Sequence, residues 1–358
     1  MNPVNAVNRA NLARLTRHRL FWPVAVLVLL LVVNAVVTPG FLAIRVRDGH
    51  LYGSLIDILR FGAPLIMVSL GMTMVIATGG IDLSVGSVVA ISGAMACFLI
   101  SEGQGLAVAL ALSFGLCLVL GLWNGLLVTR LSIQPIIATL ILMVGGRGIA
   151  QLITGGQIIT IDRDSGYREI GGGHLAGLPV AVLIVLASVA AAAVLARRTA
   201  LGLLLESVGG NAEASRLVGI RASGLIVLGY VFCAVCAGVA GWMISSDVSA
   251  ADGNNAGLWI ELDAILAVVL GGTALTGGRF SIAGTVVGAL IIQTLNTTIY
   301  TAGIPPRTTL VFEAAVVTFV CLLQSPAFRA KVGRRRPGGP VQPPADPPSA
   351  DKKVEVPA

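Results

Sequence analysis

The chain has 358 residues, of which 56% are apolar and 11% charged, and its formal net charge is +7. Soluble globular proteins carry about 25% charged residues, so this composition excludes a water-soluble enzyme. Its basic residues stand in short groups between long apolar runs and not in stripes beside aromatic residues. This pattern excludes a nucleic-acid-binding module, so no nucleic acid is expected as a partner. The sequence indicates an all-α, polytopic protein in contact with membrane lipid.

Ten apolar runs are long enough to cross the ~30 Å hydrocarbon core of a bilayer as helices. In chain order they are Leu20–Val37, Leu55–Ala77, Ser84–Ile100, Leu106–Thr129, Ile133–Ile153, Leu178–Ala196, Gly224–Ile244, Leu258–Leu275, Ile282–Ile299 and Thr308–Leu323. No small-residue cleavage site closes the first run, which favours an uncleaved span over a secretory signal. We therefore expect a cytoplasmic tail over residues 1–19, a membrane domain over 20–325, and a disordered, basic, Pro-rich cytoplasmic tail over 326–358.

Charge predicts the orientation. With both termini in the cytoplasm, 17 Lys and Arg residues lie on the inner side and five on the outer side. The positive-inside rule favours this arrangement over its inverse, and an even number of spans agrees with it.

A short pattern repeats. Thr78-Gly79-Gly80 recurs as Thr276-Gly277-Gly278, and the same offset of 198 residues maps Gly86–Val89 onto Gly284–Val287. Each copy lies between two apolar runs, which favours two related halves, an arrangement common in transporters. The glycine pairs Gly79-Gly80 and Gly277-Gly278 are candidate points of helix breaking and bending.

Asp82 follows the first glycine pair and stands just before a span. One interpretation is a helix cap, since Asp and Ser accept hydrogen bonds from free N–H groups at a helix start. The other is a functional carboxylate. A proton relay fits less well, because the predicted position is near the cytoplasmic face and not in the middle of the membrane.

Several charged or polar side chains lie inside the predicted spans. Asp57 and Arg60 are three residues apart and can pair on one helix face. An unpaired Arg in a bilayer is costly, so we expect Arg147 to pair with Glu313 or Asp263 across helices. Glu261 lies at a similar depth, and Asn124 and Gln134 either line a polar path or join helices by hydrogen bonds.

The segment over residues 197–222 is too polar to span and is cytoplasmic by the charge argument. It predicts a short helix, a Gly-Gly-Asn turn and a second helix closed by Gly219. A docking surface for a cytoplasmic partner and a helix lying on lipid both fit this pattern.

No phosphate-binding loop, nucleophile–base pair or metal-ligand cluster occurs in the sequence, so no catalytic residue, metal or cofactor is expected on this chain. Active transport would then need another chain or an ion gradient. A secondary transporter driven by such a gradient stays an alternative.

At these residues the sequence resembles a known family. The run Thr78-Gly79-Gly80-Ile81-Asp82-Leu83-Ser84-Val85-Gly86 is similar to the hallmark of permease subunits of ribose/xylose-type ABC sugar importers. Positions Thr199, Gly202, Gly209, Asn211 and Gly219 resemble that family's cytoplasmic coupling loop. Within the family the likeness is to galactofuranose importers, on Trp123-Asn124-Gly125, on Asn254–Trp259, on Glu261–Val269 and on Gly277-Gly278-Arg279-Phe280.

The resemblance implies a ten-helix permease core in a bacterial inner membrane. It also implies three partners: a second permease (a paralogue or a second copy), a periplasmic sugar-binding protein, and an ABC ATPase subunit that carries ATP and Mg²⁺. Closure of the ATPases would push the coupling helices around Glu206–Gly219 and drive alternating access. A branched-chain amino-acid permease is the nearest alternative within the ABC class.

Overall fold

The computed structural model describes residues 20–47, 49–301 and 303, with a few single positions beyond them. The predicted tails over 1–19 and 326–358 lie outside this described part. So does the tenth predicted span, Thr308–Leu323, apart from isolated positions.

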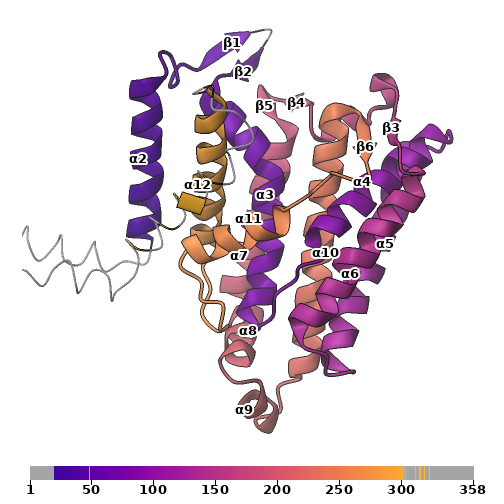
Figure 1. The fold of residues 1–358 in the computed structure, drawn as a ribbon. Coiled ribbons are helices and arrows are strands. Elements are labelled where there is room, and N and C mark those ends of the chain that lie inside the picture. The colour runs from indigo at the N-terminus through magenta and orange to yellow at the C-terminus, as the bar shows by residue number, and fades with distance from the viewer. Residues whose placement is uncertain are drawn as a thin grey trace, which may run out of the picture.

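Helices make up most of the described chain (Figure 1). Their bounds are α2 Phe21–Val37, α3 Ser54–Ala77, α4 Val85–Ser101, α5 Leu106–Thr129, α6 Pro135–Thr154, α7 Val180–Arg198, α8 Ala200–Gly210, α9 Ala212–Leu217, α10 Ala222–Val248, α11 Ile260–Leu270 and α12 Ile282–Thr301. Among the described residues, α3, α5, α6, α7, α10 and α12 are long and apolar enough to cross a membrane, and α2 and α4 are shorter apolar helices. The predicted all-α, multi-span class is confirmed.

One predicted span is wrong in length. The apolar run Leu258–Leu275 contains only the 11-residue helix α11, which at 1.5 Å per residue is about 16 Å long, half of a bilayer core. Trp259, with a φ of +68°, precedes it, and the Gly271-Gly272 pair ends it. In Figure 1 α11 lies obliquely across α3, against which it packs.

Three short antiparallel strand pairs, which the hydropathy pattern did not predict, close one end of the molecule. They are β1 Arg45–Arg47 with β2 His50–Tyr52, β3 Ile158–Thr160 with β6 Ala250–Asp252, and β4 His174–Leu175 with β5 Leu178–Pro179. Two 3₁₀ turns, η1 Arg163–Ser165 and η2 Tyr167–Ile170, lie near them in the chain. Figure 1 shows these strands at the end opposite to α8 and α9.

Helix α10 forms the centre of the bundle with α3, and also packs against α4 and α5. Small residues allow the close approach. A β-carbon added to Gly71 of α3 would lie 2.8 Å from Cys233 Cα, and one added to Gly121 of α5 would lie 2.7 Å from Val231 Cα. Cys233 and Cys236 are buried and free, so they serve this packing as small residues.

Candidate functional site

The segment over residues 197–222, called the coupling segment after its predicted role, folds into two helices as predicted. The predicted Gly-Gly-Asn turn is shorter than expected, because Gly209 and Gly210 belong to α8 and only Asn211 joins the helices. Thr199 caps α8 by accepting from Leu201 N at 3.2 Å, and Asn211 caps α9 by accepting from Ala214 N at 2.9 Å. Gly219 has a φ of +87° and ends the segment. Leu217 and Val218 beside it are 81% and 76% exposed. Figure 1 shows α9 projecting from the bundle, so its tip presents an apolar surface beyond the bundle.

Backbone contacts anchor α8 to the bundle. Gly202 packs so closely on the end of α7 that a β-carbon there would overlap the Ala196 carbonyl oxygen. Glu206, one turn further, is half-buried in a hollow with Arg197 and Ser281. The first and last turns of α8 therefore both pack against other parts of the bundle. The contacts of the last turn connect α8 to the repeated glycine pattern.

These contacts bring together three glycine pairs, which we call the glycine junction: Gly79-Gly80, Gly209-Gly210 and Gly277-Gly278. A β-carbon on Gly209 would overlap the Ala77 carbonyl oxygen at the end of α3 and would lie 2.5 Å from Gly278 N. One on Gly277 would lie 2.9 Å from Gly79 Cα. Gly278 N also donates to Ala77 O at 2.9 Å. The two copies of the repeated pattern therefore touch each other and the end of α8.

Backbone conformation explains why glycine stands at three of these positions. Gly79, Gly277 and Gly278 have φ values of +82°, +86° and +90°, in the left-handed region that side chains rarely adopt. The glycine junction brings the end of α8 into backbone contact with the end of α3 and with two loops, residues 78–84 and 271–281.

Asp82 lies at the far end of the first loop, 1% exposed. Its Oδ1 accepts from Ser84 N at 2.9 Å, from Ser84 Oγ at 2.6 Å and from Asn124 Nδ2 at 3.4 Å. Asn124 Nδ2 also donates to Ser84 Oγ at 2.8 Å, and Leu83 N donates to Thr139 Oγ1 at 3.1 Å. Asp82 thus bonds to Ser84, the residue just before α4, but no side chain caps the first turn of α4, so the capping interpretation is wrong. Asp82 also joins this loop to α5, while Thr139 joins it to α6.

The predicted polar residues are not all together. Asn124 is 1% exposed within the Asp82 network, whereas Gln134 is exposed at the start of α6. Tyr230 of α10, which the sequence did not single out, lies under the junction: a β-carbon on Gly80 would be 2.7 Å from its hydroxyl oxygen. That hydroxyl is buried without a hydrogen-bond partner among the described residues.

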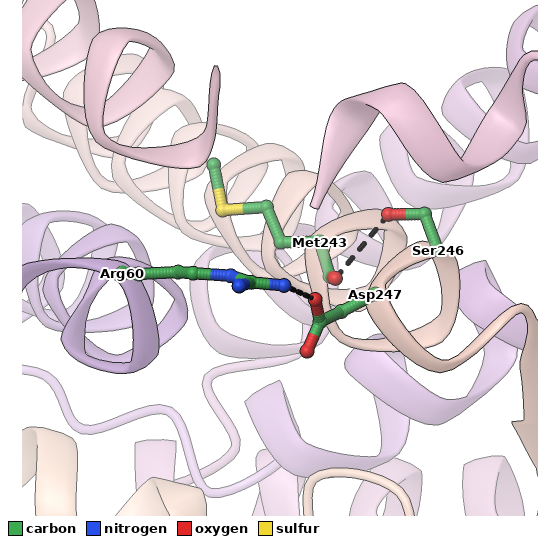
Figure 2. A network of polar contacts seen from close by, with 4 residues as sticks. All are labelled: Arg60, Met243, Ser246 and Asp247. Atoms are coloured by element: carbon green, nitrogen blue, oxygen red, sulfur yellow. Dashed lines mark hydrogen bonds and ion pairs between the residues drawn. The ribbon is translucent and has the colours of Figure 1, made fainter. Parts of the chain in front are cut away.

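At the strand end of the bundle, Arg60 forms an ion pair that differs from the predicted one. Figure 2 shows the Arg60 guanidinium of α3 reaching Asp247 of α10, next to Met243 and Ser246. The ring of Phe61 lies 5.5 Å from Arg60 Cζ. Asp57 acts on Arg60 through its charge only. The i,i+3 rule failed here because a partner on another helix lies closer.

Arg147 contacts the loop that precedes α11. Its Nη1 donates to Ala256 O at 2.7 Å, and the charges of Glu261 and Asp252 act on it. Glu261, and not the half-buried Asp263, is the α11 carboxylate whose charge acts on Arg147. Pairing with Glu313 lies outside the described residues. Hydrogen bonds from Asn255 and Asn254 lower the pKa of the Asp252 carboxyl in β6.

Glu261 itself is 3% exposed, and its Oε2 lies against Gly86 at the start of α4, with no hydrogen-bond partner in the described part of the chain. The described residues include no group of three or more His, Cys, Asp or Glu side chains that could hold a metal ion. The site consists of close backbone contacts between glycines and of buried polar networks.

Comparison with known proteins agrees with this geometry. The family model described as "Branched-chain amino acid transport system / permease component" matches residues 54–321. The galactofuranose transporter permease protein YtfT of Escherichia coli is 47% identical, covering 87% of this chain and 93% of the relative. The fructose import permease protein FruF of Bifidobacterium longum is 38% identical, with 90% and 93% covered. The ribose import permease protein RbsC of Bacillus subtilis is 35% identical, with 83% and 90% covered.

No solved structure matches the chain. The chain belongs to the family of membrane permease components of transport systems, and its relatives place it among the sugar ABC-importer permeases. It is a multi-pass protein of the inner membrane.

Proposed function

We propose that this chain is one of two permease subunits in an importer that moves a monosaccharide inward by alternating access. ATP is hydrolysed on a separate ATPase subunit that docks on α8 and α9, and a periplasmic binding protein delivers the sugar to the strand end. Both termini lie in the cytoplasm, as the charge distribution favours. ATP and Mg²⁺ are bound by the ATPase, and this chain holds no cofactor.

The glycine junction is the observation that carries this proposal. A docking helix alone could be a passive anchor, but α8 ends in backbone contact with Ala77 and Gly278. A push on α9 would therefore pass through α8 to the end of α3 and to the loop over residues 271–281. At tightly packed interfaces, a small shift of one helix is converted into a movement of the whole neighbouring element.

From the glycine junction, a movement of α8 would reach the rest of the bundle through two loops. The loop over residues 78–84 leads into α4, which the Asp82 network ties to α5 and α6. The loop over 271–281 leads into α12, which packs on α3 and α11. Tipping these two groups in opposite directions would expose the pathway alternately to each side of the membrane.

The substrate is proposed as galactofuranose or a ribose-like sugar. The supporting relatives carry galactofuranose, fructose and ribose in their names. The family description mentions branched-chain amino acids, which makes such an amino acid the competing substrate. The Gly79-Gly80-Ile81-Asp82 pattern favours sugar.

A secondary carrier driven by an ion gradient is the second candidate. The half-helix α11 and the buried Glu261 are features that such carriers share. A docking segment anchored at both ends of α8 has no role in that mechanism, so the ABC reading is preferred.

The test is uptake into proteoliposomes that hold the co-purified complex. Labelled galactofuranose, ribose and leucine are each offered with internal ATP, and then with a proton gradient but no ATP. The proposal predicts sugar uptake with ATP alone. Uptake of leucine, or uptake of any substrate under the gradient without ATP, would contradict it.

A further inference from the structure

An apolar groove opens between α7 and α10, next to the coupling segment. Met74, Ala192 and Leu205 are buried in its floor, and Leu195 and Leu228, each 47% exposed, stand at its mouth. The groove has a cavity volume of about 150 Å³, and every residue that lines it is apolar. An apolar hollow of this kind inside a membrane suits a hydrocarbon occupant better than a polar one.

Two cationic residues follow the groove in the chain at the end of α7, although neither lines it. Ala196 lines it, and Arg197 and Arg198 follow directly as the last residues of α7. Both Arg side chains are exposed, and neither forms an ion pair within the described part of the chain. Glu206 shares a neighbouring hollow of about 250 Å³ with Arg197 without such a pair. The apolar groove thus ends one residue before two positively charged residues of α7.

We propose that this groove binds one acyl chain of an anionic phospholipid, whose phosphate is held by Arg197 and Arg198. Basic pockets between transmembrane helices on the cytoplasmic side are suited to anionic head groups. The charge complementarity selects this occupant. A second protein helix would need acidic side chains opposite the two Arg residues, whereas an apolar solute would gain nothing from them.

The position gives the lipid a role. Leu201 and Leu205 of α8 line the groove, so the acyl chain packs directly on the helix that ends at the glycine junction. The lipid braces α8 between α7 and α10. Since this concerns the chain and the bilayer alone, it stands independently of the transported substrate.

The experiment is native mass spectrometry of the full chain, extracted from nanodiscs of phosphatidylcholine with one part in five of phosphatidylglycerol. Leu195→Trp fills the mouth, and the double variant Arg197→Gln/Arg198→Gln removes the two positive charges. Leu186→Trp, at a 57% exposed position on α7 away from the groove, is the matched control for bulk. Arg130→Gln, at the exposed end of α5, is the matched control for charge.

The expected result is phosphatidylglycerol retained on the wild type and on both controls, and reduced by roughly fivefold or more in the two groove variants. Equal retention by all five proteins would overturn the proposal, as would equal retention of phosphatidylcholine. If Leu195→Trp instead removes a second polypeptide from the spectrum and leaves lipid unchanged, the groove is a protein interface and the proposal fails.

Discussion

The two ends of the bundle are held together by different means. At the coupling end, Gly79, Gly209 and Gly277 bring backbone against backbone, with no side chain between them. At the strand end, long side chains reach across gaps, as Arg60 does to Asp247. A backbone contact transmits a push with little slack, whereas a side-chain contact can break and form again. Under the proposed function, the backbone contacts of one end would transmit force, and the side-chain contacts of the other end would allow reversible closure.

Among the variants that test this difference between the two ends, we expect the largest effect from Gly209→Ala. The added methyl group would overlap Ala77 O, so α8 must move away from the junction. We expect ATP-driven uptake to fall by roughly tenfold or more, since coupling energies of ~1–3 kcal/mol correspond to such factors. Uptake is measured in proteoliposomes, with ATP hydrolysis recorded in parallel.

Gly210→Ala is the matched control, because a β-carbon there meets nothing within 4 Å. It should preserve both uptake and hydrolysis. An equal loss of uptake in Gly209→Ala and Gly210→Ala would show that the close contacts of Gly209 are not needed for transport.

Gly80→Ala tests the layer beneath the junction. Its methyl group would lie 2.7 Å from the Tyr230 hydroxyl oxygen and 3.1 Å from a Val75 methyl group. Overpacking of this kind costs ~1–3 kcal/mol, so uptake should fall about fivefold. Adding Tyr230→Phe removes an unpartnered hydroxyl and should restore part of the loss. No recovery in the double variant would show that Tyr230 is not the obstacle.

The strand end is tested through stability. Asp247→Asn leaves the Arg60 cation without its charge partner, and both side chains are 24% exposed. The free energy of unfolding should fall by about 1–2 kcal/mol, less than for a fully buried pair. The Arg216–Glu213 pair on α9, at 71% and 68% exposed, is the comparison: Glu213→Gln should cost under ~0.5 kcal/mol. Thermal unfolding in detergent ranks the two, and the reverse order would contradict the account.

The smallest effect concerns pH at the strand end. Burial, with added repulsion from His50 and Arg60, lowers the pKa of His174 below its usual 6.5, and Glu169 opposes this. The rings of His50 and His174 lie 4.6 Å apart. The folded state therefore binds fewer protons than the unfolded state, so stability is present above pH 6.5 and is lost as pH falls through that value.

The readout is hydrogen exchange at Leu51, whose amide donates to Gly177 O at 2.9 Å between the two hairpins. Exchange corrected for its intrinsic rate should be roughly twofold to fivefold faster at pH 5.5 than at pH 7.5. His174→Gln should flatten this dependence. An unchanged slope in the variant would assign the effect to another group.

Local features were predictable from the sequence. Hydropathy located eight spans as helices. The Gly209-Gly210-Asn211 run and Gly219 predicted the helix–turn–helix of the coupling segment, because turns and caps are short-range signals. The length of α11 was missed, since the apolar run continues past Gly271 although the helix stops there.

Contacts between distant segments were not predictable in this way. The repeat offset drew attention to Gly79 and Gly277, but nothing local indicated that Gly209 would lie against both. The partner of Arg60 was missed for the same reason: spacing rules report neighbours on one helix, and Asp247 is 187 residues away. Tyr230 gave no signal, because one tyrosine in an apolar span resembles any other core residue.

The central claim is that α8, α9 and the glycine junction move as one body when ATP is bound. Pulsed electron paramagnetic resonance measures this directly, with spin labels on Glu213→Cys and Thr276→Cys in a chain whose five native cysteines are replaced. The account predicts that the distance between these labels stays constant on adding ATP, while the distance from Thr276→Cys to a label on the exposed Arg45→Cys at the strand end changes. A changing distance between the first two labels in a complex that still transports would contradict the account.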